Sequence, residues 1–96
     1  MTDALASCSA FQRDVLWTLA HEGASKGTAI QAALADYYEE DVNHGRLYTN
    51  LDALVDAGLI TKSARDRRTN EYALTDLARD ALAARQRWQA SEEVSL

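Results

Sequence analysis

The sequence predicts a mainly α-helical domain with one small β-hairpin. Three observations predict this fold class. Apolar residues recur at helical spacing in four separate segments, two short strand-like segments flank a polar turn before the last of them, and a length of 96 residues allows one small core. We therefore expect a single domain with the element order helix–helix–helix–strand–strand–helix.

The first two predicted helices cover residues 10–22 and 28–38, with a loop at residues 23–27 between them. Ser9 can cap the first helix, because its side-chain oxygen can accept a backbone N–H that has no partner within the helix. The inward positions of both helices follow a helical repeat. They are Phe11, Val15, Leu16, Leu19 and Ala20 in the first helix, and Ile30, Leu34 and Tyr37 or Tyr38 in the second.

The third predicted helix, residues 43–57, has an apolar face and an unusual outward face. Asn43 can cap its start, and Gly58 can adopt the left-handed conformation that ends a helix. The apolar face consists of Leu47, Leu51, Leu54 and Val55. The outward face carries Gly45, Arg46, Thr49 and Ala53, with Asp56 at its C-terminal end and Tyr48 and Asn50 at its flanks. A helix that meets only water usually carries Glu, Lys and Gln. Small and polar residues with one arginine instead suit close approach to the bases of a DNA groove.

A hairpin with a basic tip follows this helix. Strands are expected at residues 59–65 and 71–74, joined by a polar loop at 66–70. This is the arrangement of a winged helix-turn-helix, in which the helix enters the major groove and the hairpin tip reaches phosphates or the neighbouring minor groove. Thr75 can then cap a last helix at residues 76–90, which we expect to serve dimerisation.

Residues 9–90 are expected to form this domain, with a flexible N-terminus at 1–8 and a flexible tail at 91–96. The chain has no apolar run long enough to span a bilayer and no signal peptide, so we expect a cytoplasmic protein without membrane contact. Cys8 is the single cysteine, and no Cys/His spacing fits a zinc site. No nucleophile motif or phosphate-binding glycine loop occurs. We therefore expect no enzymatic activity, no catalytic residues, no metal and no cofactor.

The net charge of −5 is an objection to nucleic-acid binding, because most nucleic-acid-binding domains are basic. The charge is unevenly placed, however, since residues 62–68 contain four basic residues and one acidic residue, a local charge of 4 − 1 = +3. The many Asp and Ala residues and the few lysines also have a halophilic character. At 1 M salt the Debye length falls to about 3 Å, so groups at contact distance decide binding. The alternative is an acidic protein that binds another protein.

Two blocks of the sequence form a family pattern. The first is Gly45-Arg46-Leu47-Tyr48 with Leu51, Leu54 and Gly58-Leu59-Ile60, and the second is Arg65-Asp66-Arg67-Arg68-Thr69-Asn70-Glu71-Tyr72 with Leu74-Thr75. Joined in this order, they resemble the PadR family of winged-helix transcriptional regulators, and especially its short members from halophilic archaea, over about residues 11–88. The resemblance implies a dimeric DNA-binding repressor or activator without enzymatic activity.

The candidate DNA contacts lie on the third helix, at the start of the second helix and on the hairpin. They are Thr28, His44, Arg46, Tyr48, Thr49, Asn50, Arg65, Arg67 and Arg68. Arg46 suits a bidentate contact to guanine, and its alternatives are a phosphate contact or a surface arginine without a role in binding. Thr49 suits a thymine methyl, and Asn50 suits either an adenine edge or a local contact. The other candidates suit phosphates, with local packing or a solvated loop as their alternatives.

A second surface is expected to form a homodimer. Its candidate residues are Phe11, Trp17, Leu77, Ala81, Leu82, Arg85 and Trp88. The last helix is more apolar than its own small domain can cover, and its alanines permit close packing, so a two-fold dimer formed together with the first helix is its natural use. Ordinary packing within the chain is the alternative. Two-fold symmetry would place the two recognition helices about 34–36 Å apart, one turn of DNA.

The sequence therefore predicts a sequence-specific transcriptional regulator that binds double-stranded DNA as a dimer, through the helix at 43–57 and the wing at 65–70. The alternative function is a winged-helix protein-interaction module that does not bind DNA. The acidic net charge favours that alternative.

Overall fold

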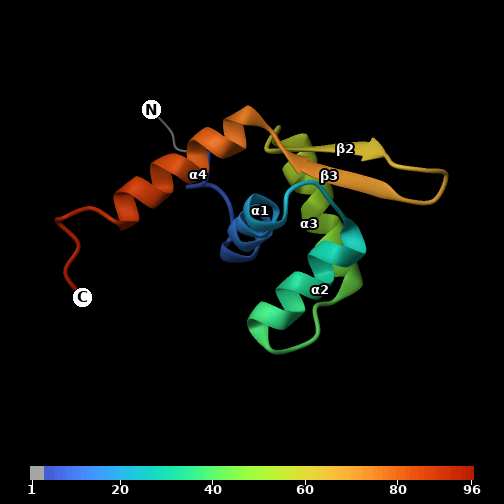
Figure 1. The fold of residues 1–96 in the computed structure, drawn as a ribbon, viewed down its shortest axis with the longest axis horizontal. Helices are drawn as coiled ribbons and strands as arrows, with labels where there is room; N and C mark the ends of the chain where they lie inside the picture. The colour runs from blue at the N-terminus through green and yellow to red at the C-terminus, as the bar shows by residue number, and fades with distance from the viewer. Residues whose placement is uncertain (1–3) are drawn as a thin grey trace.

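The computed structural model describes residues 4–96 and confirms the predicted fold class. The elements are, in chain order, α1 (Ala10–Glu22), β1 (Ser25–Lys26), α2 (Gly27–Tyr38), α3 (His44–Asp56), β2 (Ile60–Ala64), β3 (Asn70–Leu74) and α4 (Asp76–Gln89). Helix α1 lies in the middle of the molecule, between α4 and the α2–α3 pair (Figure 1). The hairpin of β2 and β3 and the end of α4 extend to opposite ends of a body of 48 × 30 × 20 Å.

Helices α1, α3 and α4 begin at the side-chain caps that the sequence predicts. Ser9 forms a complete capping box with Gln12, in which each side chain accepts the backbone N–H of the other residue. Asn43 accepts the backbone N–H of Arg46 at 2.8 Å. Thr75 caps α4 in the same way. The four predicted helix positions are confirmed to within one or two residues at each end.

The end of α3 is also as predicted. Gly58 has a φ of 76°, in the left-handed region that favours glycine. The N–H groups of Gly58 and Leu59 donate to the carbonyls of Val55 and Leu54, both at 3.0 Å, which satisfies the last turn of the helix. Leu54 and Leu59 are both buried, so the chain leaves α3 for β2 with its apolar residues still turned to the core.

In the described residues the sheet has one strand more than the predicted hairpin. The strand order is β1–β3–β2, and both pairs are antiparallel. Residues 23–27 are expected to form a loop, but Ser25 pairs with Tyr72 and Lys26 pairs with Glu71. A strand of two residues has no alternating pattern, so the sequence could not reveal it. The pairing fixes the start of α2 against the base of the hairpin.

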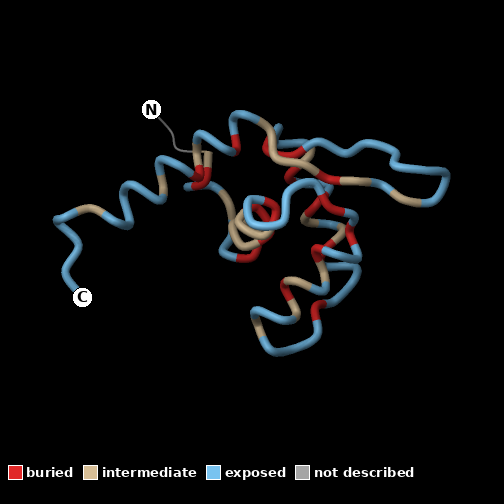
Figure 2. Tube along the Cα trace, viewed as in Figure 1, coloured by how far each residue is buried: buried red, intermediate tan, exposed pale blue. Residues whose placement is uncertain are grey.

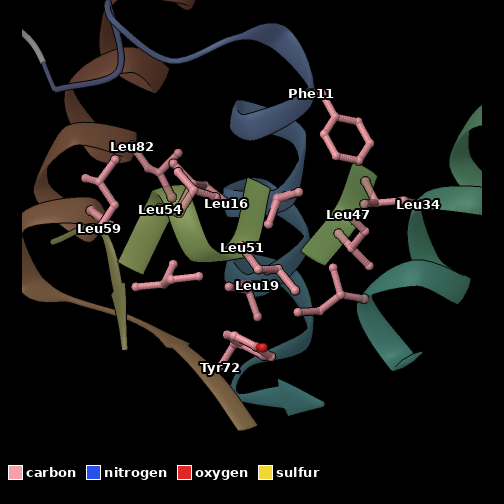
Figure 3. Close-up of a cluster of buried hydrophobic side chains, with 14 of the residues drawn as sticks. Phe11, Leu16, Leu19, Leu34, Leu47, Leu51, Leu54, Leu59, Tyr72 and Leu82 are labelled. Atoms are coloured by element: carbon pink, nitrogen blue, oxygen red, sulfur yellow. The ribbon is translucent and has the colours of Figure 1, made fainter. Parts of the chain in front are cut away.

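The core gathers around the apolar side of α1. Val15 and Leu16 are fully buried there, and Leu19 is 2 % exposed. Figure 3 shows leucines of α3 and Tyr72 of β3 converging on this side, and Figure 2 shows that the hairpin beyond its base and the outer half of α4 lie mostly outside it. Of the two tyrosines offered for the inward side of α2, Tyr38 packs on the core and Tyr37 is 75 % exposed.

Two expectations about which residues are buried differ from the structure. Ala20 is expected on the inward side of α1, but it is exposed near the end of that helix. Residues 4–8 are expected to belong to a flexible end, but they form a turn in which Leu5 is fully buried. The Leu5 carbonyl accepts the Arg13 side chain at 3.0 Å, which ties this turn to α1. A single leucine among small polar residues has no periodicity from which its burial could be predicted.

The part of the described chain that follows α4 and its C-cap is the C-terminal segment at residues 91–96. Residues 1–3 of the expected flexible N-terminus lie outside the described residues. Residues 91–96 follow α4 as a short turn, with the Val94 N–H donating to the Ser91 carbonyl at 3.0 Å. None of the helices in residues 4–96 combines the length and the hydropathy needed to cross a membrane.

Replacing Leu5 by alanine should lower the free energy of unfolding by about 2–5 kcal/mol, because truncating a buried leucine loses its burial and leaves a cavity. Urea denaturation followed by circular dichroism measures this difference. The matched control is Ser7→Ala, an exposed neighbour, which should change the value by about 0.5 kcal/mol or less. Equal stabilities of the two variants would show that residues 4–8 do not pack on the core in solution.

Candidate nucleic-acid interface

The outward face of α3 is exposed, as the sequence predicts. Its exposed members are Gly45, Arg46, Thr49 and Ala53. His44, in the first turn, is exposed as well, and its ring stacks on the ring of Tyr48 with 4.3 Å between the centroids. The two residues predicted to contact phosphate at this end of α3 therefore form one aromatic unit.

Arg46 lies over an aromatic ring of another helix. Its guanidinium carbon is 3.9 Å from the centroid of the Phe11 ring in α1. Phe11 stacks in turn on Tyr38 of α2, with 6.4 Å between the ring centroids, and the Tyr38 hydroxyl donates to the Asp14 carboxylate. Burial, followed by this hydrogen bond, raises the pKa of Tyr38 to about 12, so the hydroxyl keeps its proton. The stack connects α1, α2 and α3 behind Arg46.

Asn50 makes the local contact that the sequence leaves open as its alternative. Its side-chain Oδ1 accepts Nε2 of Gln12 at 3.0 Å, and its Nδ2 donates to the carbonyl of Arg46 at 2.8 Å. Sequence reasoning did not single out Gln12. The spacing of Ser9 and Gln12 signals the capping box, but no sequence signal connects Gln12 to a residue 38 positions away.

The start of α2, the first half of α3 and the hairpin meet at a concavity of about 200 Å³. It is lined by Lys26, Gly27, Thr28, Tyr48, Arg68, Thr69, Asn70 and Tyr72. Helix α2 begins there without a side-chain cap, so its first N–H groups have no side-chain acceptor. A Cβ on Gly27 would overlap the Tyr48 hydroxyl, so glycine permits the close packing of Tyr48 on α2. The structure thus brings Thr28, Tyr48 and Arg68 to one side of the molecule.

Two ion pairs neutralise part of the positive charge of the hairpin. Arg65 pairs with Glu71 across the two strands at 3.5 Å, and Lys62 pairs with Asp52 of α3 at 4.0 Å. Arg65, Lys62 and Asp52 are exposed and Glu71 is half-buried, so each pair stabilises the fold by about 1 kcal/mol or less. The pairs have a larger effect on the surface charge. They partly neutralise Arg65 and Lys62, which are two of the four basic residues predicted to oppose the acidic net charge.

The tip of the hairpin keeps two unpaired cations. Among residues 4–96, Arg67 and Arg68 take no part in an ion pair, and both side chains are exposed. Asp66 shapes the turn, since its carboxylate accepts the backbone N–H of Arg68 at 2.9 Å. This hydrogen bond is the main cause that lowers the pKa of Asp66. The Arg65 N–H closes the loop by donating to the Thr69 carbonyl at 2.8 Å.

The residues predicted for the dimer surface do not form one patch. Leu77 and Trp88 are exposed on α4, and with Ala81 and Arg85 they recur at helical spacing along one flank. Trp17 lines a groove on the other flank of α4, beside Arg79, Leu82, Ala83 and Gln86. Leu82 is buried within the chain at 4 % exposure, and Phe11 is 5 % exposed in the stack beneath Arg46.

The fold and the outward face of α3 define a winged-helix DNA-binding domain. The model of the family described as "Transcriptional regulator PadR-like family" matches residues 15–84. The chain belongs to this family, and it is a DNA-binding transcriptional regulator rather than an enzyme. The family membership predicted from the two sequence blocks is thereby confirmed, and the DNA-binding interpretation is favoured over the interaction module. Among the described residues, no group of three His, Cys, Asp or Glu side chains could hold a metal ion.

The solved structures with this fold include RosR, a protein of H. salinarum. In the complex structure of hsRosR-S1, the protein is 48 % identical to this chain in sequence. The two folds superpose with a TM-score of 0.90 over 99 % of this chain and 83 % of that chain. The structure of RosR grown from NaBr also shows 48 % sequence identity, with a TM-score of 0.88 over 96 % of this chain and 83 % of that chain. Reduced AbfR bound to DNA is 20 % identical, with a TM-score of 0.70 over 88 % and 60 %, which shows a shared fold. No curated protein matches the chain.

Proposed function

We propose that two copies of the chain bind one double-stranded DNA site, each with α3 in the major groove and the hairpin on phosphates or in the adjacent minor groove. The observation that carries this proposal is the shared concavity, where the start of α2, Tyr48 of α3 and Arg68 of the wing face the same side. AbfR, which has the same fold, has been solved bound to DNA. A target on the chromosome also supports a cytoplasmic location.

In this proposal the exposed residues of α3 read the bases. Arg46 is the leading candidate, because its planar guanidinium can donate two hydrogen bonds to the edge of a guanine. Thr49 lies one turn further along the same face and offers a methyl group to thymine. Asn50 supports the backbone of Arg46 instead of reading a base, because both of its polar groups already have protein partners.

The remaining candidates contact the DNA backbone in this proposal. The uncapped start of α2 at Thr28 presents N–H groups and a positive dipole end to a phosphate. The stacked His44 and Tyr48 lie beside it at the start of α3. Arg67 and Arg68 at the tip supply positive charge, while the pairing of Arg65 with Glu71 reduces its own share. Phosphate contacts of this kind position the protein on the duplex without reading its sequence.

The dimer in this proposal uses α4. Its outer flank leaves Leu77 at 52 % and Trp88 at 66 % exposure, which is a large apolar area to leave in water. The Arg85 guanidinium lies 5.1 Å from the Trp88 ring and extends the same flank. A two-fold contact through this flank would set two copies of α3 about one DNA turn apart, ~34–36 Å.

Replacing Arg46 by alanine should reduce discrimination between the cognate site and a site with one changed base pair by about 1–3 kcal/mol, the value of a bidentate base contact. Electrophoretic mobility shift with a site selected from genomic fragments measures this ratio. The control is Arg87→Ala, the same change on α4, which should leave the ratio unchanged. Full discrimination by Arg46→Ala would mean that Arg46 contacts only phosphate.

Replacing Arg67 and Arg68 together by alanine should weaken binding to all DNA sequences alike, because phosphate contacts carry no sequence information. The slope of log affinity against log salt concentration should fall in magnitude by about 2, or about 1 for each lost contact. Fluorescence anisotropy over a salt series measures the slope. A loss confined to one base-pair position would instead make the wing a specific reader of the minor groove.

Replacing Leu77 and Trp88 together by aspartate should produce a monomer, because two carboxylates on this flank oppose burial against a second copy. Sedimentation equilibrium measures the mass, and circular dichroism should show an intact fold, because both side chains are exposed within one chain. Tyr37→Asp, at another exposed aromatic residue, is the matched control. If the double variant remains a dimer, the groove beside Trp17 becomes the candidate interface.

A further inference from the structure

The first turn of α1 contacts the outward face of α3 through two adjacent residues. Phe11 lies under the guanidinium of Arg46, and Gln12 donates to Asn50. Neither Phe11 nor Gln12 lines the concavity where α2, α3 and the hairpin meet. Helix α1 therefore touches the candidate DNA-reading residues without lining the concavity on which the proposed function rests.

The contact with Phe11 restricts a side chain that is otherwise flexible. Arg46 is exposed and, among residues 4–96, takes no part in an ion pair. The aromatic face attracts the guanidinium and holds it near one position, while the ring itself is 5 % exposed and backed by Tyr38. The N–H donors at the edge of the guanidinium plane remain available to a base, because stacking engages the face of the group.

The contact with Gln12 restricts the backbone at the same position. The Gln12 Oε1 accepts the Ser9 N–H at 3.0 Å, and its Nε2 donates to Asn50 at 3.0 Å. Asn50 then donates to the Arg46 carbonyl at 2.8 Å. A continuous series of hydrogen bonds thus runs from the cap of α1 to the backbone of Arg46, and it fixes the side chains of Gln12 and Asn50.

We propose that Phe11 and Gln12 are positioning residues for DNA recognition, which hold Arg46 in its base-reading conformation before DNA arrives. An arginine fixed in advance loses less rotamer entropy on binding, so more of its hydrogen-bond energy appears as discrimination between sequences. This inference rests on the proposed function, in which Arg46 reads a base. It adds that sequence discrimination depends on α1, a helix to which the proposed function assigns no DNA contact.

The first test uses the free, full-length protein and needs no DNA. An aromatic ring shifts the NMR signals of nuclei above its face upfield, so the side-chain Nε–H and Cδ protons of Arg46 should be upfield of those of Arg67 and Arg68. In Phe11→Leu, which keeps an apolar side chain in the core, this shift should disappear. Val15→Ala, a core truncation on the same helix, should keep it and controls for lost stability. Absence of the shift in the unchanged protein would overturn the inference.

The second test measures discrimination between the cognate site and a site with a changed base pair. Phe11→Leu should lower this ratio about two- to fivefold, the factor that corresponds to one cation–π contact at an exposed site. Its affinity for non-cognate DNA should stay within about twofold of the unchanged protein, because phosphate contacts are untouched. Val15→Ala should change neither quantity.

A second variant keeps the inference falsifiable if Phe11→Leu folds poorly. Gln12→Glu retains the capping box, because a carboxylate also accepts the Ser9 N–H, but it cannot donate to Asn50. It should lower discrimination about two- to tenfold, the range that corresponds to losing one neutral hydrogen bond. Ser9→Asp adds the same negative charge at the same helix start and keeps the cap, so it controls for electrostatic repulsion of DNA.

The outcomes separate this inference from the proposed function. If Arg46→Ala loses discrimination while both positioning variants keep it, Arg46 reads a base but α1 does not position it, and the inference is wrong. If Arg46→Ala also keeps discrimination, Arg46 does not read a base, and the inference fails together with the role that the proposed function gives to Arg46. Tighter or more discriminating binding by Phe11→Leu would show that the stack restrains Arg46 from the DNA, which overturns the inference as well.

Discussion

Burial of one side of α1 is the constraint on which the rest of the structure depends. A chain of 96 residues can build one small core, and that core consists of the residues that α1 shares with the helices and strand around it. Helices α2, α3 and α4 and strand β3 pack against α1, whose Val15, Leu16 and Leu19 are almost completely buried. The same requirement determines which surfaces stay outside the core. They are the outward face of α3, the hairpin beyond Ile60 and the outer half of α4 (Figure 2). The surfaces proposed for DNA and for a second copy are therefore those that a core of this size cannot cover.

The parts of the fold that depend on near neighbours in the sequence could be predicted. The helix starts depend on caps at Ser9, Asn43 and Thr75, and the end of α3 depends on Gly58. Each of these signals acts within one turn of helix. The outward face of α3 followed from the periodicity of its leucines, because an apolar face of a helix fixes the opposite face as well. These predictions needed no knowledge of which helix lies beside which.

The parts that depend on distant residues could not be predicted. Strand β1 exists because Ser25 meets Tyr72, and two residues cannot form an alternating pattern. Asn50 was open to two interpretations because its partner, Gln12, lies 38 positions away. Phe11 was predicted for the dimer surface on the basis of its place on α1 alone, and the stack with Arg46 and Tyr38 required three helices to approach. In this chain, residue types and spacing identified which face carries the candidate site, while tertiary packing determined what each side chain on that face is free to do.

In this protein, long-range charge contributes less to DNA recognition than the geometry of groups at contact distance. The net charge of −5 repels DNA at long range, and ion pairs reduce the contribution of Arg65 and Lys62, so Arg67 and Arg68 carry most of the attraction near the tip. In concentrated salt, where the Debye length is about 3 Å, neither the repulsion nor the attraction extends beyond contact. A regulator under such conditions gains little from steering and depends on groups that already have the correct geometry when contact occurs. An arginine held on a buried ring meets that need, because salt screens a contact at 3.9 Å much less than it screens attraction over longer distances.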